Sequence, residues 1–226
     1  MILNSKKTKC LPFINSHTKN LLPQLSVEPG TNIEVIYQLK LVGLVITSEM
    51  TWDDHVDYTI GRVYKTLWQL TRFKQMVSDK KKLIIFYILK VRSILMFGAV
   101  CFHSALTQEQ SKRLELQQKR SLAIILGSDY QNYKNALLLT SLPRLDTLRG
   151  EASLQWSIKA QNNPQHKHLF PLNQSLANTR YRKKFSEYIC KGSKFYNSAI
   201  PAMTRALNQY ELTKSGWIFT LSNSED

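Results

Sequence analysis

The spacing of apolar residues changes near Met50. From residue 33 to residue 41 apolar and polar side chains alternate, which predicts a strand with one buried face. The apolar run continues to Ile46, and Gly43 within it suggests a bulge or a close backbone approach. Beyond Met50 the apolar residues at 56, 60, 63, 67 and 70 step by four and three, as on one face of a helix. A small β unit therefore precedes a helical region.

Start and stop signals divide the remaining sequence into helices. Thr51-x-x-Asp54 and Thr107-x-x-Gln110 fit capping boxes, and Gly127 is typical of a helix end. We expect helices over 51–77, 78–106, 107–126, 133–142, 144–160 and 201–212, a short strand at 11–14, a turn at 29–32, and core leucines at 137, 138, 139 and 142. The predicted fold class is α+β, mainly α with a small antiparallel β unit at the N-terminus and a helical bundle after it.

The charge of the chain predicts a polyanionic partner. Its 226 residues include 31 Lys and Arg against 16 Asp and Glu, for a formal net charge of +15. Such a surplus favours nucleic acid or an anionic membrane. Because the basic residues are spread along the sequence, a single electrostatic tail is disfavoured.

Cysteine usage and hydropathy favour a location inside the cell, in the nucleus or cytoplasm. Three isolated cysteines without a Cys-x-x-Cys pair indicate a reducing compartment. Residues 83–106 are apolar enough to suggest a membrane span, but Lys90 and Arg92 lie inside them. Each would cost roughly 2.5–3.5 kcal/mol near a bilayer centre. We therefore expect a buried helix and no membrane partner, and no signal sequence is expected from the short apolar start.

Several blocks resemble, in order, the reverse transcriptases of non-LTR retrotransposons (LINE-like, jockey-like). Lys40 to Gly43 resembles the Lys-x-x-Gly block of that family, with Val42 as a departure, and Met50 to His55 resembles its Leu-Thr-Trp-x-x-His. Further similar blocks lie at residues 3–9, 86–95, 113–120, 142–145 and 195–201. Departures occur at Cys101-Phe102 and Leu148-Arg149.

The resemblance implies an organisation and a function. Residues 1–50 would be the end of the polymerase palm, 51–161 a helical thumb-like domain, and 162–226 a linker and basic C-terminal tail with a terminal helix. The expected function is binding of the primer–template duplex within an RNA-directed DNA polymerase, with the hairpin around Lys40 to Gly43 guiding the primer terminus. The family's catalytic aspartates would precede Asn4, so we expect no catalytic residue, no primer extension and no cofactor here. The missing catalytic half of the polymerase would hold the Mg²⁺. That half is a further expected partner of this chain.

Basic residues supply the candidate binding sites for an RNA–DNA hybrid or duplex. Lys112 with Lys119, and Arg113 with Arg120, are seven residues apart and share one helical face that could follow phosphates, or could simply be solvated. Cations at the start of a helix oppose its dipole, which suggests phosphate contact for the lysines at 80–82. Basic residues around 180–184 alternate with aromatic ones that could stack bases or cover a core. The predicted nucleic-acid-binding residues are Lys7, Lys40, Gly43, Lys80, Lys81, Lys82, Lys112, Arg113, Lys119, Arg120, Arg180, Arg182, Lys183 and Lys184.

Two alternatives remain open at this point. A non-catalytic basic helical module of transposon origin could bind RNA, DNA or a protein partner. A metal nuclease built on Asp53, Asp54, His55 and Asp57 is weaker, because adjacent carboxylates in a first helical turn complement the helix dipole without any metal. The histidines at 166 and 168 lack a third ligand of suitable spacing, so no metal site is predicted.

Overall fold

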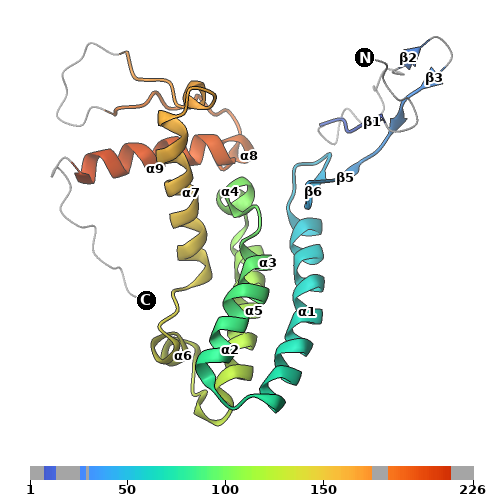
Figure 1. Ribbon diagram of the computed structural model, residues 1–226. Coiled ribbons are helices and arrows are strands. Elements are labelled where there is room, and N and C mark those ends of the chain that lie inside the picture. Colours follow the sequence, from blue (N-terminus) through green and yellow to red (C-terminus); the bar gives the residue numbers. More distant parts are fainter. Residues whose placement is uncertain (1–7, 14–25, 29–30, 175–182, 215–226) are drawn as a thin grey trace. The chain divides into compact units, whose positions relative to one another are not determined.

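The computed structural model describes residues 8–13, 26–28, 31–174 and 183–214 (Figure 1). These residues are mainly helical with short strands near the N-terminus, which confirms the predicted fold class. The chain forms two compact units: unit 1 comprises 1–95 and 108–136, and unit 2 comprises 96–107 and 137–226. The boundaries of these units differ from those of the expected segments 1–50, 51–161 and 162–226. The assignment of those segments to parts of a polymerase stays a prediction.

The β part of unit 1 consists of three two-stranded pairs. Strand β1 (Lys9–Cys10) pairs in parallel with β4 (Glu34–Val35), and β2 (Ser26–Glu28) pairs antiparallel with β3 (Thr31–Asn32). Strand β5 (Gln38–Leu41) forms an antiparallel hairpin with β6 (Leu44–Thr47).

The sequence pattern placed these strands only approximately. The alternating stretch 33–41 is interrupted, and Val35 and Tyr37 are exposed, so it has no single buried face. The strand expected at 11–14 is wrong for residues 11–13, which form no strand and follow β1 directly, and residue 14 is outside the described residues. Of the expected turn at 29–32, the first two residues also lie outside them, and the last two form β3. Short strands on a small sheet bury too little surface to impose a strict alternation.

Gly43 lies in a hairpin turn instead of the expected bulge. Leu41 pairs with Leu44, which leaves Val42 and Gly43 as a two-residue loop with φ of 48° and 88°. A two-residue turn with both φ values positive matches the right-handed twist of the flanking strands. Glycine adopts this conformation freely, whereas a β-branched valine is strained in it.

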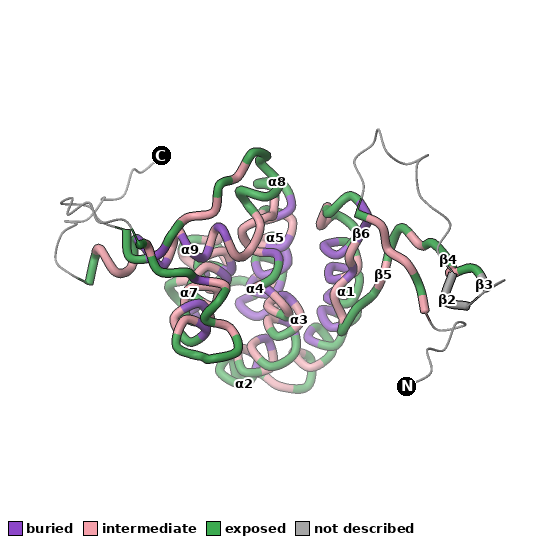
Figure 2. Tube along the Cα trace, turned by 90° about the horizontal axis from the view of Figure 1, so that it is seen from above, coloured by how far each residue is buried: buried purple, intermediate pink, exposed green. Residues whose placement is uncertain are grey.

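Four helical segments form the rest of unit 1. They are α1 (Asp53–Met76), the run formed by α2 (Lys80–Phe86), the π-helix η2 (Tyr87–Arg92) and α3 (Ser93–Met96), α5 (Gln108–Leu126) with the 3-10 turn η4 (Gly127–Asp129), and the start of α6 (Tyr133–Thr140). Figure 2 shows buried positions recurring along α1. The core they form includes Val56, Val63, Leu70, Leu83, Tyr87, Val91, Leu95, Leu114 and Leu122.

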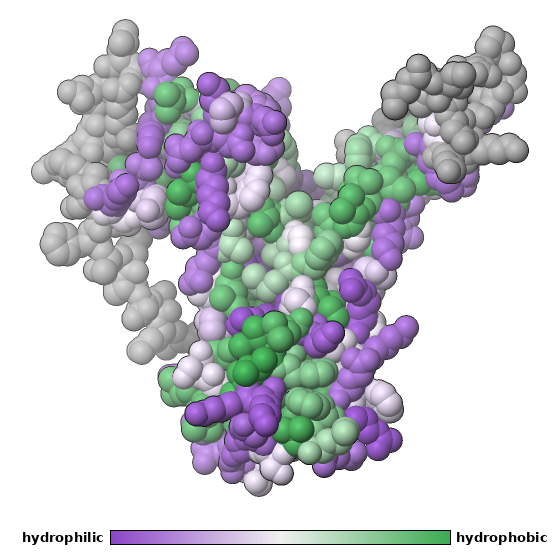
Figure 3. All heavy atoms as spheres, viewed as in Figure 1, coloured by the Kyte–Doolittle hydropathy of each residue, from purple (hydrophilic) through white to green (hydrophobic). Residues whose placement is uncertain are grey.

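The helix expected over 78–106 is neither continuous nor fully buried. It contains a π-helical turn and is broken where Gly98 adopts φ of 68°. Because a π turn takes up more residues than an α turn, side chains four apart stay on one buried face, while Ile85 and Leu89 face solvent. In Figure 3 hydrophobic residues gather on the face where α2 lies. By length and composition alone, the interrupted helical run Lys80–Ala105 is the one stretch among the described residues that is long and apolar enough to span a membrane.

Unit 2 has a core formed by residues from several segments. Its elements are α4 (Ala99–Phe102), the 3-10 turn η3 (His103–Ala105), α7 (Leu145–Asn162), the 3-10 turn η5 (Lys167–Leu169), α8 (Ser193–Tyr196) and α9 (Ala199–Lys214). Ala160, Phe170, Phe185, Met203 and Leu207 are buried together. In the stretch after residue 161, which was expected to be a linker and tail, Phe170 and Phe185 join this core, whereas residues 162–165 are exposed.

Candidate nucleic-acid interface

A ladder of polar contacts joins α1 to α5 within unit 1. Gln110 Nε2 donates to Asp53 Oδ1 at 2.8 Å, and Arg113 forms an ion pair with Asp57. About two helical turns beyond this ion pair on both helices, Arg120 Nη1 donates to the Tyr64 hydroxyl at 2.8 Å. Since the partners advance in the same direction on both helices, α1 and α5 run parallel.

These contacts change the interpretation of the basic stripe expected on α5. Arg113 and Arg120 hold α1 in place, and the Asp57 carboxylate raises the pKa of Arg113. Lys112 and Lys119 are exposed, with half-exposed Leu116 between them. The face predicted to follow phosphates is therefore partly a helix–helix interface.

A second group of cations lies over aromatic rings of α1, and it comes from α1 itself, from α5 and from β5. Arg72 lies 5.4 Å from the Trp68 ring centre, and Arg120 lies 5.6 Å from that of Tyr64. Arg62 lies 5.8 Å from the ring centre of Tyr58. Lys40 of strand β5 reaches the same Tyr58 ring at 4.3 Å. We call the set Lys40, Tyr58, Arg62, Tyr64, Trp68, Arg72 and Arg120 the aromatic–cation surface.

The exposure of these rings is the feature that requires an explanation. Trp68 is 63% exposed and Tyr64 is 50% exposed, although large aromatic side chains gain most from burial. The opposite half of α1, which carries Val56, Val63 and Leu70, is buried. The rings are therefore excess to the core and available to a partner.

The electrostatics of this surface favour an anion. Between residues 58 and 76, α1 carries Arg62, Lys65, Arg72 and Lys74 and no acidic residue. A hydrogen bond from Lys40, with the nearby charge of Arg62, lowers the pKa of the Tyr58 hydroxyl. A cation over an aromatic face keeps its outward N–H groups for a phosphate oxygen.

The hairpin tip next to Lys40 is also exposed. Val42 is 83% exposed and holds φ of 48°, while Gly43 follows it in the turn. Strained backbone conformations cluster at functional sites, so the tip is a candidate contact point. The two predicted residues of this hairpin, Lys40 and Gly43, thus lie one on each side of its strained residue.

Some of the other predicted cations form ion pairs within the protein, and others are exposed. Lys80 forms an ion pair with Asp129, which explains its position at the start of α2, whereas Lys81 and Lys82 are exposed. In unit 2, Lys183 pairs with Glu187 at 2.8 Å and Lys184 with Glu211 at 3.1 Å. Lys7, Arg180 and Arg182 lie outside the described residues.

The acidic start of α1 has structural partners. Trp52 is the N-cap and makes no side-chain cap bond, so the expected capping box with Thr51 does not form. Asp54 accepts instead from Gln38 of β5 at 3.2 Å. His55 is buried, and its Nδ1 accepts from the Val45 backbone N–H at 3.4 Å. Within the described ranges, no three His, Cys, Asp or Glu residues come together as metal ligands would.

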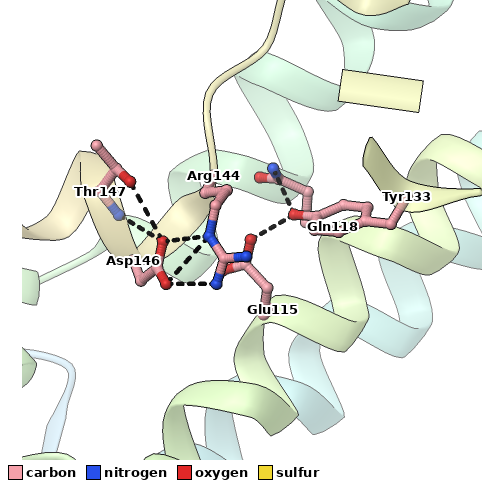
Figure 4. A network of polar contacts seen from close by, with 6 residues as sticks. All are labelled: Glu115, Gln118, Tyr133, Arg144, Asp146 and Thr147. Atoms are coloured by element: carbon pink, nitrogen blue, oxygen red, sulfur yellow. Dashed lines mark hydrogen bonds and ion pairs between the residues drawn. The ribbon is translucent and has the colours of Figure 1, made fainter. Parts of the chain in front are cut away.

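A buried hydrogen-bond network fixes α5 against the π-helix. The Tyr87 hydroxyl donates to Gln118 Oε1 at 2.5 Å, and Gln118 Nε2 donates to the Tyr133 hydroxyl at 3.0 Å. Tyr133 in turn donates to Glu115 (Figure 4). Burial raises the pKa of both tyrosines, and Glu115 raises that of Tyr133 further, so both hydroxyls remain donors. The network holds α5 in the position from which Arg120 contacts α1.

Figure 4 also shows a polar group that belongs to unit 2. Arg144 Nη2 lies 2.6 Å from Asp146 Oδ2 at the start of α7. The Arg144 guanidinium lowers the pKa of the Asp146 carboxyl, which also accepts from the Thr147 backbone N–H at 2.7 Å. These contacts stabilise the beginning of α7.

Sequence reasoning missed most of the aromatic–cation surface. Tyr58 with Arg62, and Trp68 with Arg72, are four residues apart, the spacing at which helical side chains meet. That spacing, together with the acid-free stretch 58–76, is the signal that could have found them.

Comparisons with known proteins add no identification. No protein-family model, no curated protein and no solved structure matches this chain. The function must therefore be inferred from the residues themselves.

Proposed function

We propose that unit 1 binds nucleic acid through its aromatic–cation surface, as the thumb-like part of a retrotransposon RNA-directed DNA polymerase. The observation that carries the proposal is the exposed half of α1, on which Trp68 and Tyr64 each lie beside an arginine. A solvated charged face would not require exposed aromatic rings, whereas a nucleic-acid-binding face uses both.

In the proposed complex, cations and rings have different tasks. Arg62, Arg72 and Lys65 would contact phosphate oxygens, which supplies affinity with little sequence preference. The Trp68 ring would pack against sugars or an exposed terminal base. The hairpin tip at Val42 and Gly43 would approach the end of the primer strand, as the resemblance to non-LTR reverse transcriptases implies.

The test is the salt dependence of binding to a short labelled RNA–DNA hybrid, followed by fluorescence anisotropy. Each phosphate contact contributes about 0.9 to the slope of log affinity against log salt. Arg62→Gln and Arg72→Gln should each flatten this slope by roughly 0.9 or less. Trp68→Ala should weaken binding with an unchanged slope.

Lys134→Gln is the matched control, because Lys134 is exposed in unit 1 but lies outside the aromatic–cation surface. It should leave the slope nearly unchanged. Binding that is insensitive to salt, or equally affected by all four variants, would contradict the proposal. Comparison with a DNA duplex of the same length tests the polymerase origin, which predicts at least equal affinity for the hybrid.

A further inference from the structure

Unit 2 contains a hollow of about 470 Å³ beside η5 that the proposed function of unit 1 does not use. Its volume falls within the roughly 300–1,000 Å³ range of small-molecule sites. It lies between the end of α7 and the segments around Phe170 and Phe185.

The wall of the hollow is built as a fixed structure. Phe185 N donates to Asn208 Oδ1 at 2.8 Å, and Asn208 Nδ2 donates to Phe185 O at 3.0 Å. Leu172 pairs with Phe185 in an antiparallel bridge, and Ser186 N donates to Pro171 O at 2.8 Å. Both sides of the wall are therefore tied to each other and to α9.

The lining combines apolar, amide and cationic groups. Pro171 and Leu172 give it an accessible apolar surface, since Leu172 is 64% exposed, whereas Phe170 is buried behind them. Gln161 and Asn162 add amides, and the Asn162 Nδ2 donates to Ile158 O at 3.1 Å, which leaves its Oδ1 as an acceptor.

The charge of the lining is positive. Lys167 and Lys184 both line the hollow, and none of its described lining residues is an Asp or a Glu. Lys184 is held by Glu211 at 3.1 Å and lies 5.3 Å from the Phe185 ring centre. Among the described residues, no carboxylate forms an ion pair with Lys167. Within the described part of the chain, Lys167 is therefore the cation of the rim that no ion pair compensates, and it is complementary to an anion.

We infer that this hollow binds an unpaired nucleobase together with its adjacent phosphate, from a single-stranded nucleic acid. The base would pack on Leu172 and Pro171 and be bonded by the amides of Gln161 and Asn162. The phosphate would contact Lys167 at the rim. Proteins that bind single strands pack the bases against side chains, most often aromatic ones, and contact the phosphates with cations. The inference does not rest on duplex binding by unit 1.

Binding of the full chain to a short labelled adenine DNA strand tests this inference. A strand of the same length with abasic residues keeps the phosphates but has no base to insert. We expect it to bind severalfold more weakly, because it has no base to cover the exposed apolar surface of Leu172. Equal binding of the two strands would overturn the inference.

Variants separate the hollow from general electrostatics. Lys167→Glu should weaken single-strand binding about tenfold, whereas the same charge change at exposed Lys191, outside the hollow, should weaken it much less. Equal effects of the two changes would refute a specific site. Binding of the RNA–DNA hybrid by unit 1 should change equally with the substitutions at Lys167 and Lys191. A negative result for the single strand is therefore distinguishable from failure of the function proposed for unit 1. Competition by adenosine monophosphate at concentrations near the strand's own Kd would assign the hollow to free nucleotides instead.

Discussion

Replacing Lys74 of α1 should destabilise unit 1, because the side chain of this residue binds the C-terminal end of α5. The Lys74 ammonium donates to the Ile124 carbonyl oxygen at 2.5 Å, in the last turn of α5. Carbonyls there lack helical partners and carry the negative end of the helix dipole. Lys74→Met keeps most of the apolar stem while removing both the hydrogen bond and the charge.

The magnitude follows from two contributions. A hydrogen bond from a charged group contributes about 1.5–3 kcal/mol, and a cation at a helix C-terminus about 0.3–1 kcal/mol. Because Lys74 is only half-buried, solvent screening reduces the sum, and we expect a loss of about 1–2 kcal/mol. For a chain of this size, each kcal/mol of lost stability lowers Tm by about 2–4 °C.

Gly127 provides an internal check on the same contact. It has φ of 60°, and a Cβ built there would lie 2.7 Å from the Lys74 ammonium nitrogen. Gly127→Ala should cost about 1–2 kcal/mol from backbone strain and should also displace Lys74. The double variant should therefore lose less than the sum of the two single losses.

Urea denaturation followed by far-ultraviolet circular dichroism measures these free energies of unfolding. Lys65→Met is the control, since Lys65 is exposed on the same helix. If Lys74→Met were no more destabilising than Lys65→Met, the hydrogen bond to Ile124 would contribute nothing, and the reasoning would be refuted.

Three further predictions concern buried or strained groups. Asn208→Ala should lower the unfolding free energy by about 2–3 kcal/mol in a urea titration, because it leaves the buried N–H and carbonyl of Phe185 without their amide; an unchanged midpoint would contradict this. Burial lowers the pKa of His55 below its ordinary value of 6.5, and the pKa of His103 is likewise lowered by burial and by a nearby arginine. Since the unfolded chain binds protons more readily, stability should be full above about pH 6.5 and fall as the pH drops toward the folded pKa, and His55→Gln should reduce this slope in a pH series of melts. Val42→Gly should stabilise the hairpin by up to about 1 kcal/mol, because glycine adopts φ of 48° without strain; a lower Tm would count against it.

Local periodicity determined much of the helical architecture. The helix predicted over 51–77 is α1, Asp53–Met76, and the one predicted over 107–126 is α5, Gln108–Leu126. Apolar residues at steps of three and four identify a helical face by themselves, because neighbours along one helix are fixed by its geometry. The charge of +15 likewise follows from composition alone and predicts the class of partner.

Pairing across the fold was decided by tertiary structure alone. Asp57 and Arg113 are 56 residues apart, so no local pattern shows that this arginine is held in an ion pair within the protein. Leu138 and Leu139 were expected in the core but are 72% and 56% exposed, because hydrophobicity alone does not tell which side of a short helix faces a neighbour. The sequence therefore determined which residues form helices and how much positive charge they carry. Packing determined which cations are used within the protein and which stay exposed on α1 and at the hollow of unit 2.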